Sequence, residues 1–259
     1  MLIMAREVNS MDFGRVIAVR TDKTIYRKDD IVIKLFAESY SKADIFNEAL
    51  NQARVEETEL NLPKIIEVKQ YDHKWAITLE YIKGKTLAEL MILHPENYDE
   101  YMNLFVDLQI TVHKQKCPLL NKMKDKIYRK ILEADIDATT RYDLLTSLES
   151  KPNHSKLCHG DFNPSNIIID DNGKAFILDW SHVTQGNASS DAARTYLLFL
   201  LDGNISRAEQ YLDLFCEKSG ITKKYVQGWI PIVAAAQSVR GNPEERTFLL
   251  HLLGVVDYQ

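Results

Sequence analysis

The segment CHGDFNPSN at residues 158–166, followed by ILDW at residues 177–180, decides the fold of this chain. It contains Asp161, Asn166 five residues later, and Asp179 thirteen residues after that. Between Asn166 and Asp179 lie an apolar run, the turn DDNG and a second apolar run, which together are a strong signal for a β-hairpin. Folding this hairpin brings Asn166 and Asp179 together at its open end, with Asp161 just upstream. We expect the three side chains to share one small volume.

These three side chains suit phosphoryl transfer from a metal-bound nucleotide. Asp179 offers anionic oxygens and Asn166 a neutral carbonyl oxygen, the kinds of ligand that Mg²⁺ takes in proteins. Asp161 is placed to accept a hydrogen bond from an acceptor hydroxyl and to orient it toward the γ-phosphate. Acidic residues and Asn are common in turns. The prediction therefore depends on the order of the three residues and on the hairpin between them.

The motif resembles the signature of the aminoglycoside phosphotransferase-like kinases, which include choline, homoserine and methylthioribose kinases. That signature reads H-G-D, four residues, N, and then a hydrophobic strand that ends in I-D or L-D, often before Trp. The chain carries it as His159-Gly160-Asp161, Asn166 and Leu178-Asp179-Trp180. The resemblance runs over roughly residues 14–240.

A second segment, residues 186–191, looks like the Gly-Asp-Pro…Asp segment of the same family. The resemblance implies that Asp191 is a buried carboxylate that braces the catalytic loop. Asn187 and Ala188 depart from the family pattern.

The resemblance implies an α+β, two-lobed protein kinase-like fold around an interlobe cleft. The N-terminal lobe, residues 1–82, would be small, rich in β-strands and nucleotide-binding; the C-terminal lobe, residues 83–259, would be larger, mainly helical, and would bind the acceptor. The pattern agrees, because strands and one helix precede a mostly helical part. That part is expected to hold helices near residues 86–93, 97–115, 120–148, 190–201, 205–218, 222–239 and 243–254. ATP (or GTP) and Mg²⁺ would be the cofactors, and the acceptor a small molecule with a hydroxyl group.

One lysine, Lys34, interrupts the apolar, β-branched strand DIVIKLF at residues 30–36. Buried charge must be paired, so its expected partner is a glutamate on the following helix. By the resemblance, Lys34 would bind the α- and β-phosphates of the nucleotide. A lysine on an edge strand, pointing into solvent, is the alternative.

The helix after this strand is expected over residues 41–60 and offers two glutamates as partner. Glu48 matches the family's helix glutamate, but it lies off the centre of the expected apolar stripe. Glu57 falls closer to that stripe. We expect Glu48 to be the partner, with an exposed, unpaired Glu48 as the alternative. The stripe comprises Ala43, Phe46, Ala49, Leu50 and Ala53.

Two further segments would complete the nucleotide site. By the resemblance, adenine would bond to the backbone near Glu80, Tyr81 and Ile82, where a strand leads into the helix that opens at Thr86. The hairpin before Lys34 would cover the phosphates, although its tip has no glycine to let backbone N–H groups approach closely. The residues expected to contribute there are Thr21, Lys23 and Thr24, beside Arg20.

Only about ten residues separate Asp179 from the next helix, which is short for a loop. A protein kinase needs a longer segment there to hold a peptide. A small-molecule acceptor is therefore favoured, with a Ser/Thr protein kinase and a catalytically weak nucleotide-binding module as alternatives. By the resemblance, the acceptor pocket would involve Ser181, His182 and Trp229, with core packing as the other role for Trp229. Carboxylates available for a cationic acceptor are Asp202, Glu209, Asp213, Glu217 and Asp257.

Composition suits a globular enzyme, with 45% hydrophobic and 27% charged residues. The net charge of −5, with both signs interspersed, favours neither nucleic acid nor a membrane surface as partner. No apolar run is long enough for a membrane span, and the opening MLIMA is too short for the core of a signal peptide. The three cysteines have no metal-ligand spacing, which predicts reduced thiols in a cytoplasmic protein. A monomer or weak homodimer is expected.

Overall fold

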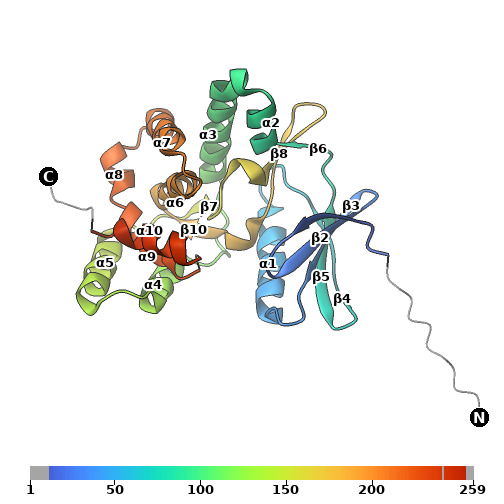
Figure 1. Ribbon diagram of the computed structural model, residues 1–259, viewed down its shortest axis with the longest axis horizontal. Coiled ribbons are helices and arrows are strands. Elements are labelled where there is room, and N and C mark those ends of the chain that lie inside the picture. Colours follow the sequence, from blue (N-terminus) through green and yellow to red (C-terminus); the bar gives the residue numbers. More distant parts are fainter. Residues whose placement is uncertain (1–11, 241, 255–259) are drawn as a thin grey trace, which may run out of the picture. The chain divides into compact units, whose positions relative to one another are not determined.

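Five strands near the start of the chain form one antiparallel sheet (Figure 1). The computed structural model describes residues 12–240 and 242–254, and all five strands lie within them. Their order in the sheet is β1-β2-β3-β5-β4, so that β3 lies between β2 and β5. The strands are β1 (Arg15–Val19), β2 (Lys23–Lys28), β3 (Ile31–Phe36), β4 (Ile65–Tyr71) and β5 (Lys74–Glu80).

Helix α1 (Lys42–Val55) follows β3 and ends five residues before the expected Leu60. Its expected apolar stripe is wrong: Phe46 and Leu50 are 43% and 48% exposed. The sequence pattern misled because polar side chains share the inner face, which lets Phe46 lie outward against Trp75 with ring centroids 5.0 Å apart. The buried residues of α1 are Ile45, Glu48, Ala49, Asn51, Gln52 and Val55.

The chain divides into two compact units. The first comprises the described residues up to Ala49 together with Pro63–Ile82, and the second comprises Leu50–Leu62 and the described residues from Lys83 onward. The chain passes from the first unit to the second after Ile82, and residues 50–62 also group with the second unit. They do so because Val55 and Leu62 belong to its hydrophobic core. The first unit has its own core, made of Phe36, Ile45, Ala49, Ile77 and Leu79.

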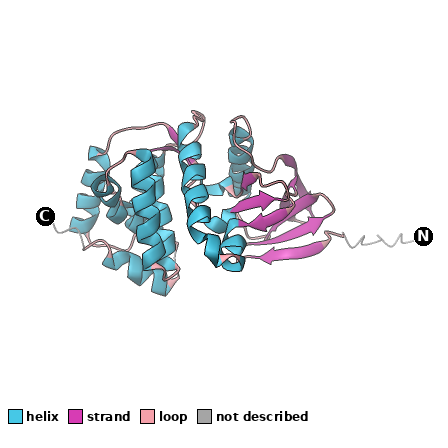
Figure 2. Cartoon of the chain, turned by 90° about the horizontal axis from the view of Figure 1, so that it is seen from above, coloured by secondary structure: helices cyan, strands magenta, loops and turns pink. Residues whose placement is uncertain are grey.

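The second unit is mainly helical (Figure 2). The fold class expected from the sequence, an antiparallel-sheet region followed by a helical region, is confirmed. Among the described residues, no helix has the length and apolar character needed to cross a membrane. The helices of this unit are α2 (Leu87–Leu93), α3 (Tyr98–Lys114), α4 (Met123–Glu133), α5 (Ala138–Ser150), α6 (Ala188–Leu201), α7 (Ile205–Ser219), α8 (Lys223–Gln227), α9 (Ile230–Ser238) and α10 (Pro243–His251).

Two of the expected helices are each divided in two. The helix expected over 120–148 breaks between α4 and α5, where Asp137 caps α5 by accepting hydrogen bonds from the backbone N–H groups of Thr139 and Thr140. The helix expected over 222–239 breaks between α8 and α9, where Pro231 occupies the first turn of α9. Each break thus carries a helix-start signal, a carboxylate cap in one case and a proline in the other, inside a run of residues whose periodicity is helical.

Short strands in the second unit position the central loop. Strand β6 (Gly84–Thr86) pairs with β8 (Ile167–Asp170), which pairs in turn with β9 (Ala175–Ile177). This is the hairpin expected from the DDNG turn. A separate pair joins β7 (Lys156–Cys158) to β10 (Thr184–Gly186). The loop that carries Asp161 therefore lies between two strand pairs that fix both of its ends.

Candidate active site

A buried carboxylate holds the loop that follows β7. Asp191, only 1% exposed near the start of α6, accepts hydrogen bonds from the backbone N–H of His159 (3.1 Å) and of Gly160 (2.7 Å). Its Oδ2 atom also lies 2.9 Å from Nε2 of His113 on α3. Gly160 has φ +80°, and a Cβ there would lie 2.6 Å from the carbonyl oxygen of His182. Only glycine fits this turn.

The bracing role that the resemblance implied for Asp191 is thus observed in its hydrogen bonds. Burial by itself would raise the pKa of Asp191, but the hydrogen bond and positive field of His113 and the amide of Gly160 hold that pKa below its ordinary value. The carboxylate is therefore ionised at neutral pH. A charged acceptor bound by two backbone N–H groups keeps the loop in one conformation.

The Asp161 carboxylate is oriented by three side chains. Asn166 donates from Nδ2 to Oδ2 of Asp161 at 3.1 Å, and Asn163 donates to the same oxygen at 3.4 Å. Arg194 on α6 lies 3.4 Å from Oδ1 through its Nη2 atom. Both amides also donate to the Asp161 carbonyl oxygen. The carboxylate is thus held in place before any ligand binds.

The hairpin brings Asn166 and Asp179 close, as its sequence predicts. The backbone carbonyl of Asn166 accepts a hydrogen bond from the N–H of Leu178 at 2.8 Å, one residue before Asp179. Nε2 of His159 lies 2.9 Å from the carbonyl oxygen of Leu178, so the central loop and the hairpin are tied together. Asp179 has φ +58°, a strained conformation for a residue other than glycine.

The donor set around this point fits a magnesium ion. Because Nδ2 of Asn166 donates to Asp161, its Oδ1 atom is the one turned away from that carboxylate. The Asn166 carbonyl oxygen and the Asp179 carboxylate are hard oxygen ligands, which Mg²⁺ prefers to sulfur or imidazole donors. A second cluster of His113, Cys158 and Asp191 has ligand atoms within 4.8 Å of one another, but it is fully buried and braces the loop.

In the first unit, Lys34 pairs with Glu48. Its Nζ atom lies 2.8 Å from Oε1 of Glu48, and both side chains are buried. Glu57 is exposed, so it is not the partner. The edge-strand alternative is wrong, since β3 is an interior strand. Lys23 on β2 lies 3.6 Å from the same Glu48 oxygen.

The remaining residues expected at the nucleotide site are within the first unit. Thr21 lies in the exposed turn between β1 and β2, and Lys23 and Thr24 begin β2. The backbone N–H groups of Glu80 and Tyr81 already donate to the carbonyls of Lys64 and Asp30.

Among Glu80, Tyr81 and Ile82, Ile82 is therefore the residue whose backbone N–H donates to no other described residue. This amide is the strongest candidate donor to adenine in that segment.

The three residues expected at the acceptor pocket differ in position. Trp229 is fully buried in the helical core. This position corresponds to core packing, the alternative to acceptor binding that the sequence left open. Ser181 is partly buried in the short turn after Asp179. His182 lines a cavity, and burial together with the nearby Lys126 lowers its pKa to about 3. His182 is therefore neutral at physiological pH.

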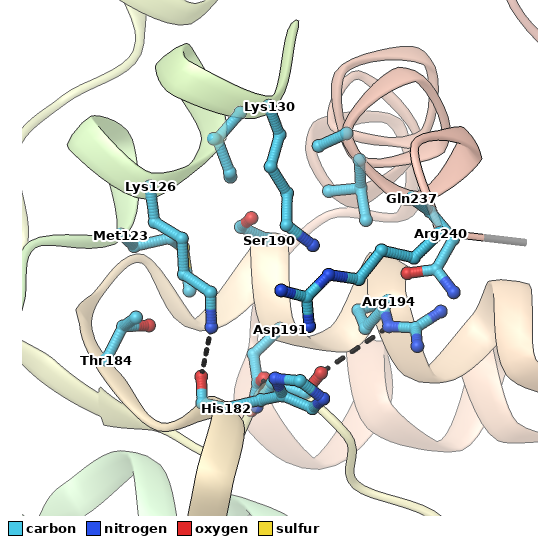
Figure 3. Close-up of a pocket in the computed structure, with 14 residues that line it drawn as sticks. Met123, Lys126, Lys130, His182, Thr184, Ser190, Asp191, Arg194, Gln237 and Arg240 are labelled. Carbon is cyan, nitrogen blue, oxygen red and sulfur yellow. Dashed lines mark hydrogen bonds between the residues drawn. The ribbon is translucent and has the colours of Figure 1, made fainter. Parts of the chain in front are cut away.

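This cavity, of about 150 Å³, lies entirely in the second unit beside the central loop (Figure 3). Sequence reasoning missed most of its polar lining. One sequence signal does point to this lining, namely the pair Lys126 and Lys130. The two lysines lie four residues apart on α4, and like charges at this spacing repel each other. The carboxylates suggested for a cationic acceptor do not line it, and Asp257 lies outside the described residues. Its polar residues are Lys126, Lys130, His182, Thr184, Ser190, Asp191, Arg194, Gln237 and Arg240.

Comparisons with known proteins agree with this geometry. A model of the phosphotransferase enzyme family matches residues 14–225. A search of curated proteins finds no match.

Among solved structures, a thermostable variant of aminoglycoside phosphotransferase APH(4)-Ia in a ternary complex with AMP-PNP and hygromycin B has a TM-score of 0.68 at 13% identity, over 95% of this chain and 93% of that one. Choline kinase LicA from Streptococcus pneumoniae has a TM-score of 0.61 at 12% identity, over 93% and 90% of the two chains. These likenesses show the fold. The family match covers most of the chain, which therefore belongs to the phosphotransferase enzyme family.

Proposed function

We propose that this protein transfers the γ-phosphate of ATP or GTP to a hydroxyl group of a small molecule, with Mg²⁺ as cofactor. The observation that carries the proposal is the pre-formed group of Asp161, Asn166 and Asp179, held by the Asp191 brace and the hairpin. Family membership supports it.

The proposed reaction is a direct transfer. The acceptor hydroxyl oxygen attacks the γ-phosphorus and forms the new P–O bond. The bond between the γ-phosphorus and the β,γ-bridging oxygen breaks, and the electron pair leaves with the nucleoside diphosphate. Asp161 accepts the hydroxyl proton. The products are a phosphate monoester and a nucleoside diphosphate.

Other residues bind and position the substrates. Asn166 and Asp179 would hold Mg²⁺, which neutralises phosphate charge when bound. Lys34, positioned by Glu48, binds the α- and β-phosphates. Thr21, Lys23 and Thr24 contribute hydroxyls, amides and charge near the phosphates, and the backbone around Ile82 binds the base.

One alternative keeps some support. The turn at Arg20–Asp22, without glycine, favours weak nucleotide binding by a module with little activity. The protein kinase alternative is disfavoured, because β10 pairs with β7 and α6 begins at Ala188. The segment between Asp179 and α6 therefore contains β10, which is paired with β7.

The test is an ADP-formation assay with a panel of sugars, polyols, amino alcohols and aminoglycosides. At least one acceptor should support turnover, and Asp161→Asn should lower it by about 10²–10⁴-fold while nucleotide binding, followed by thermal shift, is retained. Asp171→Asn, at the exposed hairpin turn, is the matched control. Nucleotide binding without transfer to any member of the panel would favour the module, and an Asp161→Asn variant as active as wild type would overturn the role of Asp161.

A further inference from the structure

The cavity beside the central loop is lined by four basic side chains from three parts of the second unit. Lys126 and Lys130 come from α4, Arg194 from α6, and Arg240 from the segment just after α9. In Figure 3, Lys130 extends downward from α4 and Arg240 extends in from the right, so that their charged ends approach one another above Arg194. Among the described residues, Asp191 is the one carboxylate in the lining, and its oxygens are already bonded to His113 and to two backbone amides.

Three of these cations, Lys126, Lys130 and Arg240, have no carboxylate ion-pair partner among the described residues. Across residues 12–240 and 242–254, no Asp or Glu oxygen lies within ion-pair distance of Lys126, Lys130 or Arg240. Lys126 donates to the carbonyl oxygen of His182 at 2.9 Å, which satisfies a hydrogen bond but not a charge. Arg194 shares its charge with Asp161, yet its Nη1 atom is buried with no hydrogen-bond partner among the described residues.

Burial and the neighbouring positive charges disfavour the charged forms of the two lysines. Burial, followed by the positive field of Lys130, Arg240 and Arg194, lowers the pKa of Lys126 to about 7. Burial and the two arginines lower the pKa of Lys130 to about 8. Lys126 and Lys130 are half-buried and Arg240 is exposed. Holding half-buried cations near one another is costly unless an anion joins them.

The cavity is continuous with the proposed catalytic residue. Gly160 lines it, Asp161 follows in the chain, and Arg194 bridges the two through its contacts with the Gly160 carbonyl and the Asp161 carboxylate, both at 3.4 Å. A ligand seated among the cations therefore lies next to the group that would accept the hydroxyl proton.

We propose that this basic cavity binds an anionic group of the acceptor, so that the protein phosphorylates a hydroxyl compound that already carries a phosphate or a carboxylate. This inference rests on the proposed function. A phosphate monoester is largely dianionic at neutral pH and has three acceptor oxygens, which match a ring of lysine and arginine donors. An apolar cavity of similar volume holds one benzene molecule, so the space fits one such group and leaves the rest of the acceptor outside. Positively charged acceptors such as aminoglycosides or choline-like amines would be repelled.

The first test measures anion binding and needs no turnover. Orthophosphate and sulfate, titrated into the nucleotide-free protein and followed by calorimetry and thermal shift, should bind and stabilise it. Lys130→Gln combined with Arg240→Gln should weaken phosphate binding by about 100-fold, since two charge-assisted contacts are lost. The control, Arg129→Gln with Arg246→Gln, removes two exposed charges from α4 and α10 and should bind as wild type. Equal phosphate binding by both double variants would overturn the proposal.

The second test compares acceptors that share one ring, namely glucose, glucose 6-phosphate, glucuronate and glucosamine. Turnover should favour the anionic members, and the Lys130→Gln/Arg240→Gln variant should raise their KM with little change in the KM of ATP. Turnover confined to glucose or glucosamine would overturn the anionic acceptor but keep the kinase. An effect on the KM of ATP alone would assign the cations to the nucleotide instead. Phosphate binding with no transfer to any compound would contradict the kinase but keep the anion site.

Discussion

The cations of the two units of this protein are treated in opposite ways. In the first unit, Lys34 is paired with Glu48 at 2.8 Å inside an interior strand. In the second unit, Lys126, Lys130 and Arg240 gather around a cavity without a carboxylate partner among the described residues. A cation that has its counter-ion in the chain is positioned before any ligand binds. In our proposal, cations without an ion-pair partner are balanced by an anion that enters the cavity, and this difference separates a positioning pair from a recognition site.

The largest expected effect on stability comes from breaking the paired charge. Glu48→Gln leaves the buried Lys34 ammonium without its carboxylate, and we expect the free energy of unfolding in urea to fall by about 3–5 kcal/mol. Glu57→Gln, an exposed glutamate just after the same helix, should change it by less than about 0.5 kcal/mol. Equal stability of the two variants would mean that Glu48 does not compensate the charge of Lys34.

The second partnered charge is Asp191, and its loss should cost somewhat less. Asp191→Asn replaces a charged acceptor by an amide whose N–H₂ group faces the N–H groups of His159 and Gly160. We expect a loss of about 2–4 kcal/mol in unfolding free energy, measured by chemical denaturation. Asp202→Asn, exposed at the other end of α6, serves as the control and should be nearly neutral. A neutral Asp191→Asn would show that the brace does not hold the loop.

The unpartnered cations should respond in the opposite direction. Lys130→Gln combined with Arg240→Gln relieves repulsion in the ligand-free protein, so we expect its unfolding free energy to rise by about 0.5–1 kcal/mol. The same change should abolish the stabilisation by orthophosphate. A ligand-free double variant less stable than wild type would indicate that these cations contribute to the fold and would remove the contrast with Lys34.

The last expected effect is a pH dependence. In the unfolded chain, lysines keep their protons up to a pKa of about 10.4, whereas folding lowers the pKa values of Lys126 and Lys130 to about 7 and 8. The unfolded state therefore binds more protons between these values, and the free energy of unfolding should rise as the pH increases from about 7 to about 9. The charged or titratable groups around the two lysines, besides each other, are Glu133, His182, Asp191, Arg194 and Arg240.

Saturating orthophosphate should flatten this rise, because a bound anion favours the protonated lysines. The measurement is a urea titration at several pH values, with and without orthophosphate. A flat profile without phosphate, or the same slope with it, would contradict the crowding of the two lysines.

The central loop was predictable from the sequence because its information is local. Asp161, Asn166 and Asp179 lie within nineteen residues and are joined by one hairpin with a recognisable turn. The pairing of Lys34 was predictable in part. The expected apolar stripe pointed away from Glu48, because Asn51 and Gln52 are buried on the inner face of α1 and polar residues carry no hydrophobic signal.

The basic cavity was not predictable in the same way. Its cations lie on α4, α6 and the segment after α9, up to 114 residues apart in the chain (240 − 126), and only packing of these elements brings them together. The net charge of −5 also hides a local excess of positive charge. Two of the carboxylates suggested for a cationic acceptor, Glu209 and Asp213 on α7, pair with Lys223 instead.

The central claim is that Asn166 and Asp179 share one divalent ion next to Asp161. Anomalous diffraction from crystals grown with Mn²⁺ and AMP-PNP tests it most directly. We predict a peak within coordination distance of Asn166 Oδ1 and the Asp179 carboxylate. A peak at the buried cluster of His113, Cys158 and Asp191, with none near Asn166 and Asp179, would contradict the account.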